Sequence, residues 1–135
     1  GYGIYDPRYV PASGRLDAAY ASRYEQALRG WAELVGAVAP HARFIPPLQF
    51  AFDDRYVRPE ARHPPLSSSL EEAIAIARAT RRLLDDAGAG DIRYRSVLPA
   101  VFIASWNEHL EGSAVEWTDE HGYGYVMAAA NVLRG

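Results

Sequence analysis

The sequence predicts an α/β protein built from parallel strand-helix repeats, and specifically the C-terminal part of a (β/α)8 barrel. Three observations support this prediction. Short apolar runs alternate three times with longer amphipathic segments along the chain. The loops that follow the apolar runs are long, whereas those that precede them are short. Three units are too few for a closed barrel of eight, which takes about 250 residues, so this chain of 135 residues would be about the last three-eighths of one.

The first unit extends from the start of the chain to Val38. Residues 1–6 (GYGIYD) resemble the end of a strand, which we place near residues 2–5, and a loop with Pro and Gly follows. Apolar residues then recur every three or four positions, which predicts a helix near residues 17–38 that Pro40 stops. The expected buried stripe consists of Tyr20, Tyr24, Leu28, Trp31, Val35 and Val38.

The second unit begins with the apolar run RFIPPLQFAF. We expect a strand near residues 43–48, which Pro46 and Pro47 keep short. Ser69 and Glu72 have the spacing of a capping box, which predicts a helix near residues 69–86 that ends at Gly88. Its expected buried face carries Leu70, Ile74, Ala77 and Leu84.

The third unit begins with VLPAVFIASW, which predicts a buried strand near residues 100–105. A charged loop at residues 118–121 precedes YGYVMAAANVL, which predicts a last helix near residues 123–133. Parallel neighbours need a crossover helix, so we expect the three strands to be parallel. The whole chain, residues 1–135, is then a single domain.

Composition narrows the possible partners and compartments. The chain has 14 basic and 17 acidic residues and a net charge of -3, so we expect no nucleic acid as a partner. No apolar run approaches the roughly 18 residues of a membrane span, so we expect no membrane-spanning segment. The absence of Cys leaves bacterial cytoplasm and export both open. The start, GYGIYDP, lacks an initiating Met and a signal-peptide pattern, which favours a processed or truncated chain.

Two glutamates follow the last predicted strand, at the end of a parallel sheet where functional residues gather. If Glu108 and Glu111 lie on one helical turn, their Cβ atoms are ~5–6 Å apart, close to the ~5–5.5 Å between the carboxyl groups of retaining glycosidases. Such proximity raises one pKa and gives an acid and a base. Trp106 would supply an apolar sugar platform and Asn107 a hydrogen bond. In the alternative interpretation, both glutamates are merely solvated charges.

Other polar and aromatic residues offer weaker candidates. Asp6, Gln49, Asp53, Asp54 and Arg55 also follow predicted strands, although Asp and Arg here can equally form a surface pair. Tyr20, Tyr24 and Trp31 lie on the helical stripe and are expected in the core, whereas Tyr2, Tyr5, Phe50 and Trp106 lie at strand ends and are possible sugar platforms. The four His show no metal-ligand spacing, so we expect no metal and no other cofactor.

The segment LPAVFIASWNEHLEGSAVE, followed by GYGY, resembles the closing strand and loop of the glycoside hydrolase family 99-like proteins. These are the endo-α-mannosidases and related bacterial polysaccharide-processing proteins, which are (β/α)8 barrels. FIPPLQFAFDDR resembles the preceding strand and loop less specifically. The resemblance implies that Glu108 is the base that assists the substrate's own 2-hydroxyl, through an anhydro-sugar intermediate, and that Glu111 is the general acid and base.

The resemblance also implies a retaining, endo-acting glycosidase that cleaves or processes an α-linked, mannan-like polysaccharide. His109 stands where the family usually has Trp, and Trp117 stands where Pro is common, so both would reshape the sugar subsites. The expected substrate-binding residues are Trp106, Asn107, His109, Glu116, Tyr5, Asp6, Gln49, Asp53 and Arg55.

The alternative is a non-catalytic glycan-binding or assembly fragment of a polysaccharide-biosynthesis protein. In either case we expect an oligosaccharide or polysaccharide as the ligand. Three barrel units leave strand edges open, which predicts that the rest of a barrel or a second copy of the chain covers them. The isolated fragment is accordingly expected to be inactive.

Overall fold

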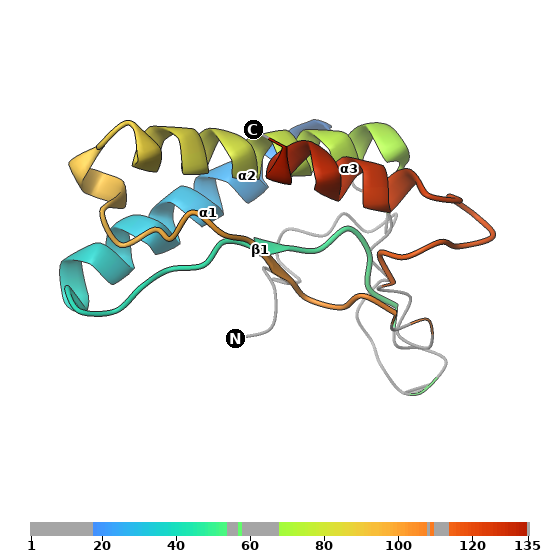
Figure 1. Cartoon of the computed structure of the whole chain (residues 1–135), viewed down its shortest axis with the longest axis horizontal. Helices are drawn as coiled ribbons and strands as arrows, with labels where there is room; N and C mark the ends of the chain where they lie inside the picture. The colour runs from blue at the N-terminus through green and yellow to red at the C-terminus, as the bar shows by residue number, and fades with distance from the viewer. Residues whose placement is uncertain (1–17, 54–56, 58–67, 108, 110–113, 135) are drawn as a thin grey trace.

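The computed structural model describes residues 18–53, 57, 68–107, 109 and 114–134. Its helices lie on one side of two short parallel strands (Figure 1). The predicted strand near residues 2–5 lies outside the described residues. The elements are α1 (Ala18–Val38), β1 (Pro47–Leu48), α2 (Leu70–Gly88), the 3-10 turn η2 (Ile92–Tyr94), β2 (Phe102–Ile103) and α3 (Gly124–Leu133).

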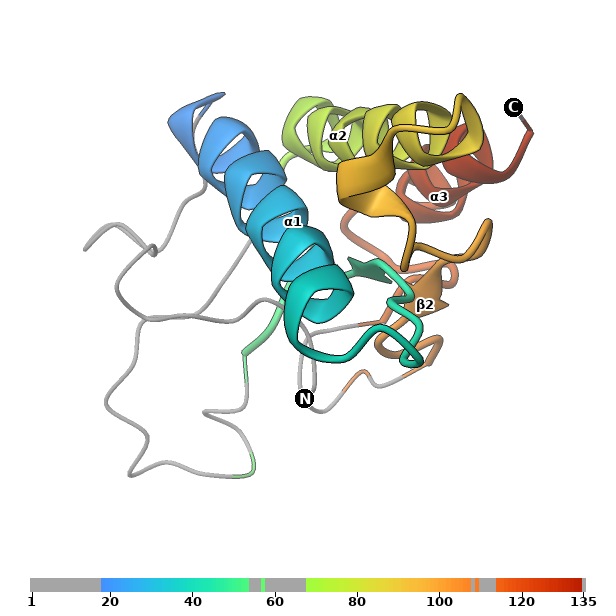
Figure 2. The same ribbon diagram turned by 90° about the vertical axis from the view of Figure 1, so that its left-hand side faces the viewer.

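Helix α2 is the centre of the helical layer, with α1 packed on one side of it and α3 on the other (Figure 2). A helix with two helical neighbours needs a broad buried face, and α2 provides one made largely of small side chains that let its neighbours approach closely. The Thr80 hydroxyl in this face donates to the Ile76 carbonyl oxygen at 3.2 Å. The buried residues are Ala73, Ile76, Ala77, Ala79, Thr80 and Leu83.

The predicted capping box at the start of α2 is confirmed. The Ser69 hydroxyl accepts a hydrogen bond from the Glu72 backbone N–H at 3.2 Å, and the Glu72 carboxylate accepts one from the Ser69 N–H at 2.6 Å. These bonds satisfy amide groups that have no partner within the helix. The helix ends at Gly88, also as predicted.

The buried stripe of α1 differs from the predicted one. Tyr24 and Leu28 are buried as expected, and the buried face continues through Ala32. Trp31 is 54% exposed and Val38 is 71% exposed, so placing them in the core was wrong. The buried face of α1 therefore runs through Tyr24, Leu28 and Ala32, and Trp31, Leu34 and Val38 form a second apolar face that is exposed.

The buried face of α2 also differs from the predicted one. Ala77 is buried as predicted, but Leu70 is exposed. Ile74 and Leu84, which were expected in the same buried face, are partly buried and pack against the edge of the core.

The two strands are parallel, with Pro47 opposite Phe102 and Leu48 opposite Ile103. The predicted parallel pairing of the second and third strands is therefore confirmed, although both strands are shorter than expected. An isolated bridge joins Phe44 to Val97 before the ladder begins. Proline lacks the N–H that a ladder requires, so Pro46 and Pro47 shorten β1. The segment before β2 bulges between Val97 and Phe102.

The core lies between the strands and the helices. Leu48 and Phe50 point into it, and both are fully buried. The hydroxyl of Tyr24 donates to the Pro47 carbonyl oxygen, which ties α1 to the outer edge of β1. The Ser96 hydroxyl donates to the Ala32 carbonyl oxygen at 2.9 Å and fixes the other end of α1. Whether the two strands belong to a barrel stays a prediction.

Candidate functional site

The loop that follows β2 is closed at its base. The carbonyl oxygen of Trp106 accepts hydrogen bonds from the backbone N–H groups of Val115 at 2.9 Å and Glu116 at 3.0 Å. Val115 is buried and so anchors the returning chain against the core. The loop therefore leaves and rejoins the protein at one point, at the carboxyl end of β2.

Several predicted site residues lie outside the part of the chain that the structure describes. Glu108 and Glu111, the expected catalytic pair, lie outside the described residues, as do Tyr5, Asp6 and Arg55.

Four predicted binding residues of the loop are described, namely Trp106, Asn107, His109 and Glu116. Asn107 is exposed, and its carbonyl oxygen accepts a hydrogen bond from the His109 backbone N–H at 3.0 Å. Nε2 of His109 lies 2.8 Å from Oε1 of Glu116. His109 and Glu116 were both expected to bind substrate, and the structure brings them together across the base of the loop.

A shallow pocket of about 420 Å³ opens beside this pair, lined by His109, Glu116, Trp117, Thr118 and Asp119. Trp106 and Trp117, on either side of the loop base, are 52% and 50% exposed. Trp117 was expected only as a departure from a family pattern, and Thr118 and Asp119 were not among the predicted site residues. The signal was an aromatic residue followed by hydroxyl and acidic groups and a turn glycine, in WTDEHG.

Two predicted binding residues follow β1. The Gln49 side-chain amide donates to the Ala51 carbonyl oxygen at 3.4 Å, so it is engaged within its own loop. Asp53 is half-buried and makes a polar or electrostatic contact. Because β1 and β2 are parallel, both residues leave the sheet at the same end as the loop after β2.

An aromatic and polar network supports this end of the sheet. Phe50 was a possible sugar platform, but it is buried, with its ring centroid 5.1 Å from that of Tyr125. That expectation was therefore wrong. The Tyr125 hydroxyl donates to the Ser68 carbonyl oxygen at 2.7 Å, and burial raises the pKa of Tyr125 to about 12. The rings of His121 and Tyr125 lie with centroids 4.5 Å apart and are tilted by 34°, so the turn before α3 packs against this helix.

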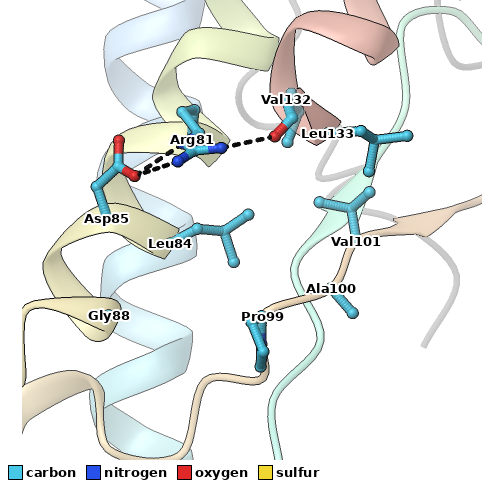
Figure 3. Close-up of a pocket in the computed structure, with 9 residues that line it drawn as sticks. All are labelled: Arg81, Leu84, Asp85, Gly88, Pro99, Ala100, Val101, Val132 and Leu133. Atoms are coloured by element: carbon cyan, nitrogen blue, oxygen red, sulfur yellow. Dashed lines mark hydrogen bonds and ion pairs between the residues drawn. The ribbon is translucent and has the colours of Figure 1, made fainter. Parts of the chain in front are cut away.

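A second pocket, of about 350 Å³, lies at the opposite end of β2 (Figure 3). Leu84, Val101 and Leu133 contribute apolar side chains to its wall. Its charged groups are already paired, because Arg81 contacts the Asp85 carboxylate at 2.7 Å and also donates to a backbone carbonyl oxygen of α3 at 3.2 Å. These contacts favour a structural role for the pocket.

The described residues contain no group of three or more acidic, His or Cys side chains able to hold a metal ion. None of the helices in the described part of the chain has the length and apolar character that crossing a membrane requires. Comparisons of this chain with family models, with curated proteins and with solved structures found no match.

Proposed function

We propose that this chain is the substrate-binding and catalytic C-terminal part of a glycoside hydrolase barrel that acts on an α-linked, mannan-like polysaccharide. The single observation that carries the proposal is the closed loop at the carboxyl end of β2. Its base is fixed by two hydrogen bonds to the Trp106 carbonyl oxygen, and the sequence within it contains Glu108 and Glu111. In barrels of parallel strands, this end of the sheet carries catalytic residues.

The residues around the loop suit a sugar ligand. Sugars have an apolar ring face and a rim of hydroxyl groups, and Trp106 and Trp117 offer exposed aromatic faces. The Glu116 carboxylate can accept hydrogen bonds from hydroxyls. Glu108 would assist the attack of the substrate's own 2-hydroxyl, and Glu111 would protonate the leaving oxygen and then activate water.

The test is turnover of an activated aryl α-mannoside by the full natural protein that carries these residues. Glu108→Gln and Glu111→Gln should each abolish turnover and leave sugar binding largely intact, because the side-chain shape remains while proton transfer is lost. Glu33→Gln, an exposed substitution on α1, is the matched control and should be fully active. Full activity in either loop variant removes that residue from the mechanism.

The second candidate is a glycan-binding or assembly module without hydrolysis. The two exposed tryptophans favour it, since aromatic platforms serve binding without any acid or base. Sugar binding by the intact protein, with no turnover even when Glu108 and Glu111 are present, would establish this candidate over the first.

A further inference from the structure

The pocket beside the closed loop is built on a rigid turn. The backbone groups of Thr118 and Gly122 exchange two hydrogen bonds, of 3.1 and 2.8 Å, and the His121 N–H donates to the Thr118 hydroxyl oxygen at 3.0 Å. On the other side, the Glu116 N–H is bonded to the loop base. Trp117 therefore stands between two fixed points of the backbone, with half of its surface open to solvent.

The polar atoms around Trp117 are arranged to meet hydroxyl groups. His109 engages Oε1 of Glu116, which orients this carboxylate and leaves Oε2 to accept a hydrogen bond from a ligand. The Thr118 hydroxyl accepts from the backbone, so its own proton is available for donation. Asp119 is exposed at the rim and adds a second acceptor.

The charge of the pocket narrows the class of ligand. Glu116 and Asp119 are acidic, and His109 is the basic side chain among the five that line the pocket. Its Nε2 already contacts Glu116 Oε1, so this single imidazole is set against two carboxylates. A uronic acid or a phosphorylated sugar would be repelled, whereas a neutral sugar meets an apolar ring and hydroxyl-binding groups.

We propose that Trp117 is the stacking platform of a subsite for a neutral hexose, with Glu116, Thr118 and Asp119 holding the hydroxyls. The inference rests on the proposed function, whose polysaccharide chain would extend over this subsite. It adds a specificity to that function, because the protein would bind uncharged glycans in preference to acidic ones.

All five lining residues belong to this chain, so the test uses the 135-residue protein and ligand-observed NMR titration. The probes are α-linked mannotriose and, as the acidic counterpart of equal length, trigalacturonic acid. The wild type should bind mannotriose and not the acidic trisaccharide. Trp117→Ala should weaken mannotriose binding by about tenfold or more, as expected for loss of a central tryptophan contact.

Trp31→Ala is the matched control, because Trp31 is exposed to a similar extent but lies on α1. It should bind like the wild type. Trp117→Phe, which preserves an aromatic face, should retain most of the binding. Asp119→Asn, which keeps the fold and removes a charge, should weaken the discrimination against trigalacturonic acid.

Unchanged mannotriose affinity in Trp117→Ala, absence of mannotriose binding in the wild type, or a preference for trigalacturonic acid would each overturn the subsite. Its failure is separable from failure of the proposed function. If the Glu108 and Glu111 variants lose turnover while Trp117→Ala binds mannotriose normally, only the subsite proposal fails. If mannotriose binding depends on Trp117 but the natural protein does not turn over the glycoside, only the hydrolase proposal fails.

Discussion

The turn that supports Trp117 depends on the backbone conformation of one residue, Gly122. Its φ angle is +54°, in the left-handed region where a Cβ atom is unfavourable. We predict that Gly122→Ala lowers the free energy of unfolding by about 1 kcal/mol. Gly122→Asn should cost less, because Asn tolerates this conformation. Denaturant unfolding followed by circular dichroism measures both changes.

Gly30 provides the opposite control for this prediction. It lies inside α1, and an added Cβ would meet no atom within 4 Å. Gly30→Ala should therefore raise the free energy of unfolding, by up to about 1 kcal/mol, because Ala favours the helix and restricts the unfolded chain. Equal effects of the two Ala substitutions would contradict the role given to the turn.

Individual residues also mark where sequence-based prediction stops. Tyr24 and Trp31 lie on one apolar stripe of α1, yet only Tyr24 is buried. Periodicity shows which side of a helix is apolar, but it does not show where on that side the neighbouring element packs. Ala32, in contrast, is fully buried. The pocket residues Thr118 and Asp119 were missed because their role depends on a loop closure that spacing does not reveal.

At the scale of elements, α1 and α2 are joined by an ion-pair network. Glu25 on α1 contacts Arg29, at 3.0 Å, and Arg82 on α2. Arg29 in turn contacts Asp86 at 2.7 Å and donates to the Tyr94 hydroxyl at 3.0 Å. The hydrogen bond from Arg82 is the largest influence on Glu25, and with Arg29 it holds the pKa of this carboxyl below its ordinary 4.5 although partial burial opposes the shift.

We predict that Glu25→Gln lowers the free energy of unfolding at neutral pH by about 1 to 2 kcal/mol. The wild type should lose this stabilisation as the pH falls below about 4.5, because a carboxyl whose folded pKa is lowered stabilises the protein only while it is ionised. The variant should lack this part of the pH dependence. Urea unfolding between pH 3 and 7, with these values chosen to lie about the Glu pKa, measures both.

Glu33→Gln is the matched control on the same helix. Glu33 is exposed, so its substitution should change the free energy of unfolding by less than about 0.5 kcal/mol. A Glu25→Gln variant that follows the wild-type pH profile would contradict the assignment of the network to α1–α2 packing.

The elements themselves differed in how far they could be predicted. The boundaries of α2 are encoded locally, since a capping box starts it and Gly88 ends it. The second and third strands were predicted at the right places and in the right orientation, but too long. Their length depends on how β1 and the segment before β2 pair around the prolines at 46, 47 and 99. Pairing partners lie far apart in sequence, so apolar content alone does not give the extent of a ladder.

At the scale of the whole molecule, two of the exposed apolar regions among the described residues bear on the predicted barrel. Trp31, Leu34 and Val38 form the uncovered face of α1. Ile45, which precedes β1, and Phe102 on β2 are exposed, and alternation places them on the face opposite the buried Leu48. In a barrel, the corresponding positions would face neighbouring helices and the filled barrel interior.

We predict that the isolated 135-residue chain self-associates, because exposed apolar surface of this kind is uncommon on a monomer and favours burial against a second copy. Light scattering on the purified chain should give a mass above that of a monomer, rising with concentration. Leu34→Glu with Val38→Lys should reduce the association by placing charges on the uncovered face of α1. A double substitution at exposed Arg78 and Gln26 to Ala, away from these apolar positions, should leave it unchanged.

Light scattering, together with an activity assay on the same chain, tests whether the three units fold and act without the rest of a barrel. If the exposed face of α1 and the exposed strand face belong to contacts with further barrel units, the isolated chain lacks the other strand-end loops that would hold a polysaccharide, and it should show no glycosidase activity. A stable monomer that cleaves an aryl α-mannoside would mean that the exposed apolar residues need no covering. That outcome would overturn the proposal that these residues are the last three units of a larger barrel.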